Sequence, residues 1–201
     1  MEAVLFWSLA GFFLGSIPFA VIIGKLVTKV DIRTVADGNP GGMNAIRAGG
    51  AKAGAPSIIL EIGKGFLPVY LARRYGMTGW EMIPICLAPV LGHAFSPFLR
   101  FRGGKALAAT AGAWLALIGL VVFPAYAALA LPFTILQTED AWSANAGMVA
   151  LLVYALWSGK TWMVVFAALN LAVVLWTHRR DLARRPQLRP WAANWLARRS
   201  T

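Results

Sequence analysis

The chain has 201 residues, of which 59% are hydrophobic and only 13% are charged, and its mean hydropathy is +0.65. A soluble domain of this size carries about 25% charged residues, so the composition excludes a water-exposed globular surface, as well as disorder, a coiled coil and a disulfide scaffold. The 19 Lys and Arg residues against 8 Asp and Glu give a net charge of +11. Because these cations stand in short clusters between long apolar runs, the pattern indicates a membrane protein with basic loops, not a nucleic-acid-binding protein.

The apolar runs predict about seven transmembrane helices, since one span needs about 20 apolar residues. Residues 106–138 form one uncharged stretch, which at about 1.5 Å per residue is too long for a single crossing. Pro124 near its middle predicts two short spans with a turn between them. We therefore predict an all-α polytopic membrane bundle of about seven short transmembrane helices, over residues 3–24, 53–72, 75–99, two parts of 106–138, 141–159 and 161–177.

The basic clusters predict the orientation of this bundle. With seven spans, 15 of the Lys and Arg residues fall on one side, and only Arg73, Arg74 and Lys160 fall on the other. The positive-inside rule then puts the N-terminus outside and the C-terminus in the cytoplasm. A six-span bundle would place the Arg-rich C-terminal segment on the outer side and break this distribution. We divide the chain into a transmembrane domain over residues 1–178 and a basic cytoplasmic tail over residues 179–201.

A first glycine-rich loop runs from Asp37 to Gly50 on the predicted cytoplasmic face. Its glycines leave backbone N–H groups able to converge on an anion. Asn39 and Asn44 add side-chain amides, and Arg47 adds a planar guanidinium suited to phosphate. The alternative interpretation is an ordinary turn-rich connection, which the two asparagines and the arginine disfavour.

A second glycine-rich loop starts at Gly92 and ends in Gly103, Gly104 and Lys105, just before an uncharged helix. Because a helix N-terminus carries partial positive charge and unpaired N–H groups, we predict a second anion site there. The loop is not a Walker A motif, since it lacks the earlier glycine and the Ser or Thr after the lysine. The alternative is that its cations serve only as positive-inside anchors.

Three polar features lie within or at the ends of the predicted spans. His178 stands where the last span emerges and is a candidate base or donor, although a single histidine there also suits an interfacial role. Glu61 and Lys64 are spaced to pair on one helix face, as a structural pair or as support for a site. Ser16 and Pro18 predict a bend in the first helix.

Taken in chain order, these segments resemble the bacterial acyl-phosphate:glycerol-3-phosphate acyltransferase family. The matching pieces are Gly15–Pro18 with Gly24 and Lys25, Asp31–Arg33, Gly38–Arg47, Gly63–Gly65, Gly92–Lys105 and His178 with Arg179. The resemblance implies a multi-pass enzyme of the bacterial inner membrane whose active site faces the cytoplasm. It implies transfer of a fatty acyl group from acyl phosphate to the 1-hydroxyl of glycerol 3-phosphate, giving lysophosphatidic acid and phosphate for phospholipid synthesis. Membrane lipids are the expected surroundings, and no cofactor, metal or nucleic acid is implied.

Within this resemblance we predict that Lys105, Arg47 and His178 are catalytic, holding glycerol 3-phosphate and neutralising developing charge. The first loop is expected to hold the donor phosphate. The other predicted substrate-binding residues are Gly38, Asn39, Gly41, Gly42, Asn44, Gly103, Gly104, Asp37 and Asp181. Because acyl phosphate is already activated, positioning and charge stabilisation suffice without a covalent nucleophile.

Some positions depart from the family pattern. Asp37, Met43 and Asp181 stand where the family has Ser, Thr and Asn. A carboxylate beside a phosphate repels it unless the carboxylate is protonated or paired. These departures leave open a relative with another acceptor or without catalysis, and a small phosphate or anion transporter is the alternative from a different class.

Overall fold

The computed structural model describes residues 1–199, and it is all-α over that range. The chain forms two compact units, Met1–Gly119 and the part that follows from Leu120. The last two residues of the predicted 179–201 tail lie outside the described part.

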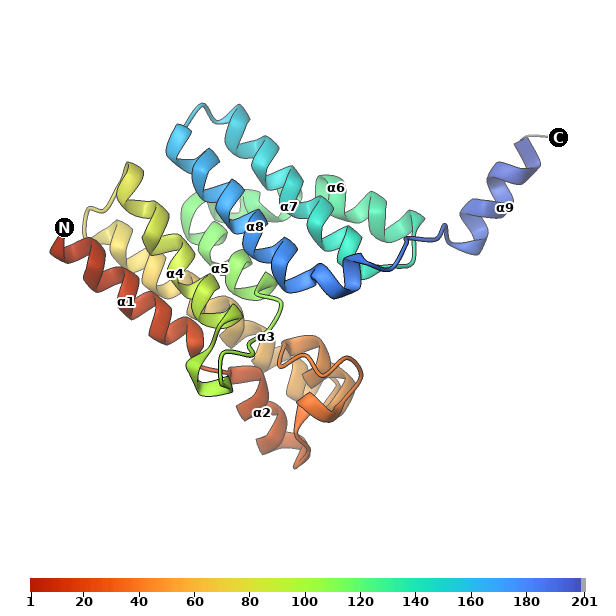
Figure 1. Cartoon of the computed structure of the whole chain (residues 1–201), viewed down its shortest axis with the longest axis horizontal. Helices are drawn as coiled ribbons and strands as arrows, with labels where there is room; N and C mark the ends of the chain where they lie inside the picture. The colour runs from red at the N-terminus through yellow and green to blue at the C-terminus, as the bar shows by residue number, and fades with distance from the viewer. Residues whose placement is uncertain (200–201) are drawn as a thin grey trace. The chain divides into compact units, whose positions relative to one another are not determined.

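The first unit contains five α-helices and three short 3₁₀ turns (Figure 1). Within it α1 packs on α4, α2 packs on α3, and α3 packs on α5. The helices are α1 Glu2–Ser16, α2 Phe19–Thr28, α3 Gly42–Arg74, α4 Met82–Ala94 and α5 Leu107–Ile118. The 3₁₀ turns are Ile32–Thr34, Gly79–Glu81 and Pro97–Leu99.

The first apolar run is broken into two helices at Ile17 and Pro18. Proline has no backbone N–H to continue the helical ladder, and it drives the preceding residue out of the helical region. Ile17 accordingly adopts φ −62° and ψ 121°, which is extended backbone. The predicted bend is confirmed, and it is a full break after which the chain changes direction (Figure 1). The break leaves backbone groups that need other partners.

Helix α3 is two helical segments joined by a sharp kink. Gly50 has φ 61° and ψ −154°, a conformation open in practice only to glycine, and Gly49 beside it is also non-helical. The segment before the kink, residues 42–48, folds back so closely that a Cβ on Gly54 would strike Ile46. About half of the first glycine-rich loop is therefore helical, and three of its predicted site residues, Gly42, Asn44 and Arg47, stand on this short segment.

The second unit consists of α6 Val122–Leu136, α7 Asp140–Trp157, α8 Thr161–Leu182 and α9 Pro190–Arg199. Within this unit α6 packs on α7, and α7 packs on α8. The long uncharged stretch is divided as predicted, but the division lies at Gly119, which has φ +65°, and Pro124 falls in the first turn of α6. Proline is tolerated there because the first-turn N–H groups have no helical partner.

Among residues 1–199, five stretches are long and apolar enough to cross a membrane. The seven-span prediction differs in two respects: it divides residues 107–136 into two spans, and it adds a span over residues 141–159 that is not one of the five stretches. The five stretches are Glu2–Thr28, Gly42–Arg74, Gly79–Leu99, Leu107–Leu136 and Thr161–Leu182. The architecture is thus that of an all-α polytopic membrane protein.

Candidate active site

The two glycine-rich loops of the first unit meet at the carboxylate of Asp37. Lys105 Nζ donates a hydrogen bond to Asp37 Oδ2 at 2.8 Å, from 68 residues further along the chain. Asn44 Nδ2 and the backbone N–H of Asn39 both donate to Asp37 Oδ1, at 2.9 and 3.2 Å. Two segments that the sequence singled out separately therefore form one polar cluster.

Asn44 links this cluster to the guanidinium of Arg47. The Asn44 side chain is 1% exposed, and its Nδ2 also donates to the carbonyls of Val35 and Asn39, both at 2.9 Å. Its Oδ1 accepts a hydrogen bond from Arg47 Nη1 at 2.9 Å. Because each member is held by another, the cluster is preorganised. We call Asp37, Asn39, Asn44, Arg47 and Lys105 the loop junction.

The carboxylate at the centre of the loop junction is ionised. Partial burial would raise the pKa of Asp37, but hydrogen bonds from Lys105, Asn39 and Asn44 outweigh that effect and lower the pKa to about 2. The Asp37 charge is compensated directly by the ammonium of Lys105. The acid that departs from the family pattern is therefore a paired one in this structure.

Gly103 and Gly104 differ from their predicted role as amide donors to an anion. Their N–H groups donate to the carbonyls of Ala94 and His93, each at 3.1 Å. Helix α5 begins only at Leu107, so neither glycine lies in its first turn. Of the three residues predicted for the second anion site, Lys105 is the one whose polar group binds an anion, the Asp37 carboxylate.

The glycine at position 104 is required by a close approach. A Cβ on Gly104 would lie against His93 Nε2 and 3.1 Å from Asn39 Oδ1. A side chain at this position would displace the His93 ring and crowd Asn39 of the first loop.

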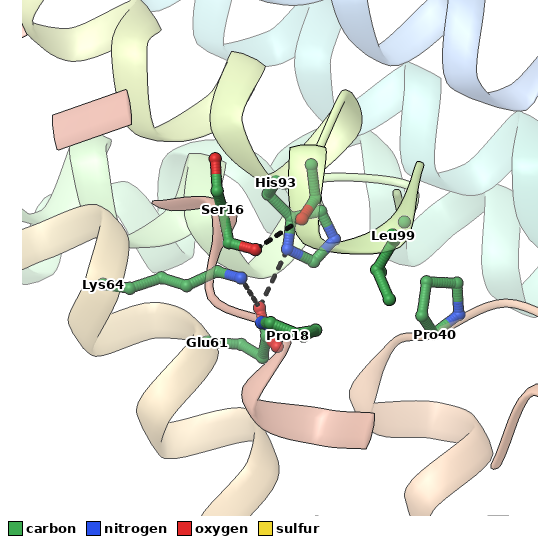
Figure 2. A pocket seen from close by; sticks show the side chains of 9 residues that line it. Ser16, Pro18, Pro40, Glu61, Lys64, His93 and Leu99 are labelled. Carbon is green, nitrogen blue, oxygen red and sulfur yellow. Dashed lines mark hydrogen bonds and ion pairs between the residues drawn. The ribbon is translucent and has the colours of Figure 1, made fainter. Parts of the chain in front are cut away.

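A buried ionic cluster lies beside this contact (Figure 2). Glu61 Oε2 is 2.6 Å from Lys64 Nζ and 2.8 Å from His93 Nδ1, and both carboxylate and ammonium are 1% exposed. Glu61 Oε1 accepts from the backbone N–H of Ala20 at 3.0 Å, and Lys64 donates to the carbonyl of Ile17 at 2.7 Å. In a membrane, backbone groups released by a broken helix must find internal partners. Glu61 and Lys64 supply partners for the break between α1 and α2.

The predicted Glu61–Lys64 pair is therefore confirmed, whereas the part played by His93 was not foreseen. Its sequence signals were its position in an apolar run, where a histidine needs a polar partner, and its place in the matched segment Gly92–Lys105. With Nδ1 held by Glu61, the other ring nitrogen of His93 faces away from that carboxylate (Figure 2). His93 thereby connects the ionic cluster to the second loop.

A small pocket lies between the helix break and the two loops. It is lined by residues that include Ser16, Pro18, Pro40, His93 and Gly104, and its empty volume, open solvent included, is about 170 Å³. The lining therefore brings residues of the ionic cluster together with residues of both loops.

Two further predicted site residues, His178 and Asp181, belong to the second unit. Both stand near the end of α8. His178 is 2% exposed, and its Nδ1 lies 2.9 Å from the carbonyl of Val174. A carbonyl accepts but cannot donate, so Nδ1 is the donor of this hydrogen bond. The roles predicted for His178 and Asp181 stay predictions.

Known proteins are similar to this chain in sequence and in fold. The family model described as Glycerol-3-phosphate acyltransferase matches residues 5–187. The glycerol-3-phosphate acyltransferase of Maridesulfovibrio salexigens is 36% identical over 180 residues, covering 90% of this chain and 92% of that protein. The enzyme of the same description from Thermus thermophilus is 35% identical over 188 residues and covers 92% of each chain.

A solved structure adds the fold to this likeness. The crystal structure of PlsY (YgiH), an integral membrane glycerol 3-phosphate acyltransferase, in its glycerol 3-phosphate form matches with a TM-score of 0.79 and 29% identity over 90% of each chain. Its lysophosphatidic acid form matches with a TM-score of 0.77 and 27% identity. Together with the matched motifs, these relatives show that the chain belongs to the glycerol-3-phosphate acyltransferase family.

Proposed function

We propose that the loop junction is where this acyl-phosphate:glycerol-3-phosphate acyltransferase holds the phosphate groups of its reactants. The reaction of the family moves a fatty acyl group from acyl phosphate to glycerol 3-phosphate and yields lysophosphatidic acid. The observation that carries the proposal is that Lys105 and Asn44 both bind the Asp37 carboxylate. Arg47 is joined to this group through Asn44. Cations and amides arranged in this way suit a phosphate.

The chemistry needs positioning more than a nucleophilic side chain. The 1-hydroxyl oxygen of glycerol 3-phosphate forms a bond to the acyl carbon, the bond from that carbon to the phosphate oxygen breaks, and the hydroxyl proton ends on the departing phosphate. Lys105 and Arg47 are proposed to hold glycerol 3-phosphate and to neutralise charge in the transition state. The Asn39–Asn44 segment is proposed to hold the donor phosphate, and His178 to assist at the acceptor.

We further infer that the loop junction lies on the cytoplasmic side of a bacterial inner membrane. Support comes from the basic clusters, because 15 of the 19 Lys and Arg residues lie between residues 25 and 52, between residues 100 and 105, and from residue 179 onward. The positive-inside rule places such clusters on the cytoplasmic side, with the N-terminus outside. A soluble acceptor such as glycerol 3-phosphate would reach the site from that side.

Phosphate release from purified protein tests the proposed function. Acyl phosphate is supplied with and without glycerol 3-phosphate, and phosphate and lysophosphatidic acid are both measured. We expect release to require the acceptor and to match lysophosphatidic acid in amount. Release that ignores the acceptor would contradict the proposal and favour a relative with another acceptor, which the acids at positions 37 and 181 otherwise suggest.

A further inference from the structure

The loop junction already contains an anion, and this anion belongs to the protein. Both oxygens of the Asp37 carboxylate are bound: Oδ2 by the ammonium of Lys105, and Oδ1 by the side-chain amide of Asn44 and the backbone N–H of Asn39. One cation and two N–H donors thus surround a single anionic group. Such an arrangement also binds phosphate oxygens. The Asp37 carboxylate therefore occupies the position that a substrate phosphate needs.

We propose that Asp37 is an internal competitor for phosphate, a specificity-determining residue that a substrate phosphate must displace from Lys105 and Asn44 before catalysis. This inference rests on the proposed function, because it takes the loop junction to be the phosphate site. The sequence predicts that Asp37 contacts the substrate, whereas in this proposal the substrate phosphate displaces Asp37 from its partners.

Exposure distinguishes this ion pair from a structural one. The side chains of Lys105 and Asp37 are 31% and 38% exposed, whereas those of Glu61 and Lys64 are each 1% exposed. Water can replace the partners of an exposed pair, so breaking it costs little, while a buried pair broken on one side leaves an unpaired charge. The Asp37–Lys105 pair is thus exchangeable, and the Glu61–Lys64 pair is fixed.

The competition also selects the class of ligand. Asp37 presents a single negative charge to Lys105, so a phosphate monoester with up to two charges and more acceptor oxygens displaces it more easily than a carboxylate or another singly charged group does. Such a site favours phosphate-bearing acceptors over acceptors with one weak anionic group. A neutral residue at this position would relax that preference.

Asp31 provides a matched control on the same segment. Its carboxylate pairs with Arg33 at 2.6 Å and is also exposed, at 32%. The hydrogen bonds from Arg33 lower the pKa of Asp31 to about 2, the same value as that of Asp37. The Asp31 carboxylate binds Arg33, whereas the Asp37 carboxylate binds Lys105 and Asn44, so Asp31→Asn removes the same charge without touching the loop junction.

The experiment compares wild type, Asp37→Asn, Asp37→Ser and Asp31→Asn, each purified as the full chain. KM for glycerol 3-phosphate and for acyl phosphate is measured, and inorganic phosphate is titrated while thermal unfolding is followed. We expect both Asp37 variants to lower KM for glycerol 3-phosphate roughly fivefold, and to lower the phosphate concentration at half-maximal stabilisation by a similar factor. Asp31→Asn should match wild type in both measurements.

Each outcome decides the inference. A KM and a phosphate midpoint that stay the same or rise in both Asp37 variants would overturn it. Failure of both variants to fold would overturn it as well, because a displaceable carboxylate cannot be essential to the fold. If wild type shows no acyl transfer, the proposed function fails, yet the phosphate titration still shows whether Asp37 competes for the anion site.

Discussion

Lys105 and Arg47 are the two cations of the loop junction, and single substitutions there should affect catalysis far more than folding. Removing one preorganised charge-stabilising donor typically costs about a hundredfold or more in rate. We therefore expect Lys105→Ala and Arg47→Ala each to lower kcat/KM for acyl transfer by at least about a hundredfold. The assay is lysophosphatidic acid formation by equal amounts of membrane-inserted protein.

Lys52 supplies the control for that measurement. It is an exposed cation on α3 just beyond the kink, so Lys52→Ala removes the same charge and keeps the loop junction intact. We expect it to retain wild-type turnover. Near-wild-type turnover in Lys105→Ala and Arg47→Ala would show that the roles proposed for them are wrong.

The charge of Asp37 should be insensitive to pH over the usual assay range. Partial burial opposes ionisation of Asp37, but hydrogen bonds from Lys105, Asn39 and Asn44 lower its pKa from 3.8 to about 2. A lowered pKa stabilises the folded state above the unfolded value, and this stabilisation is lost as pH falls from about 4 through about 2. The ratio of KM between wild type and Asp37→Asn should therefore be constant from pH 6 to 9. A ratio that changes across that range would show that another group sets the competition.

At the scale of elements, the helix break between α1 and α2 depends on buried charges from α3. Glu61→Gln leaves Lys64 buried without a counter-ion, which typically costs about 3–5 kcal/mol. The double variant Glu61→Gln/Lys64→Met removes both charges and should be less destabilised than the sum of the single variants. Thermal unfolding in detergent measures this, and Asp31→Asn, which breaks an exposed ion pair, should change little. Additive losses in the double variant would show that the pair is not coupled.

The contact between α3 and α5 depends on one glycine of the motif Gly63–Gly65. A Cβ on Gly65 would collide with the backbone of Ala109 on α5, whereas one on Gly63 would meet nothing within 4 Å in the described structure. We expect Gly65→Ala to lower the unfolding temperature, since overpacking costs about 1–3 kcal/mol. Gly63→Ala should be neutral or stabilising, because alanine favours a helix over glycine by up to about 1 kcal/mol. Equal unfolding temperatures in the two variants would contradict this packing.

The helices could be predicted from sequence because hydropathy and length are local properties. The uncharged run at the N-terminus, the break at Pro18 and the pairing of Glu61 with Lys64 all follow from residues close together in the chain. The link from Glu61 to His93 depends on a contact between helices that are distant in the chain, which no local pattern encodes.

At the candidate site, too, contacts between segments distant in the chain could not be predicted from the sequence. Both glycine-rich loops were singled out from the sequence as polar segments, but the hydrogen-bond partners of Gly103 and Gly104 were not foreseen. Gly103 and Gly104 were predicted as amide donors to an anion, and instead their amides bind carbonyls while Gly104 permits a close approach to His93. A glycine that exposes its amide and a glycine that makes room for a neighbour look alike in sequence.

At the scale of the whole molecule, the distribution of charge predicts which loops face the cytoplasm. The single cysteine, Cys86, is fully buried, so it gives little background in labelling with a membrane-impermeant thiol reagent. Four exposed positions serve as sites for one introduced cysteine each. Arg74→Cys and Lys160→Cys should be labelled in intact cells, because the positive-inside rule places these positions outside.

Arg102→Cys and Arg185→Cys should be labelled only after the cells are permeabilised. Arg102 lies in the second glycine-rich loop, so its protection places the loop junction on the cytoplasmic side, where glycerol 3-phosphate is available. Arg185 follows α8, and its side of the membrane distinguishes an odd from an even number of crossings. Labelling of Arg185→Cys in intact cells, with Arg102→Cys protected, would contradict seven spans and favour six. Labelling of Arg102→Cys in intact cells would reverse the proposed orientation of the site while leaving the loop junction and its chemistry unchanged.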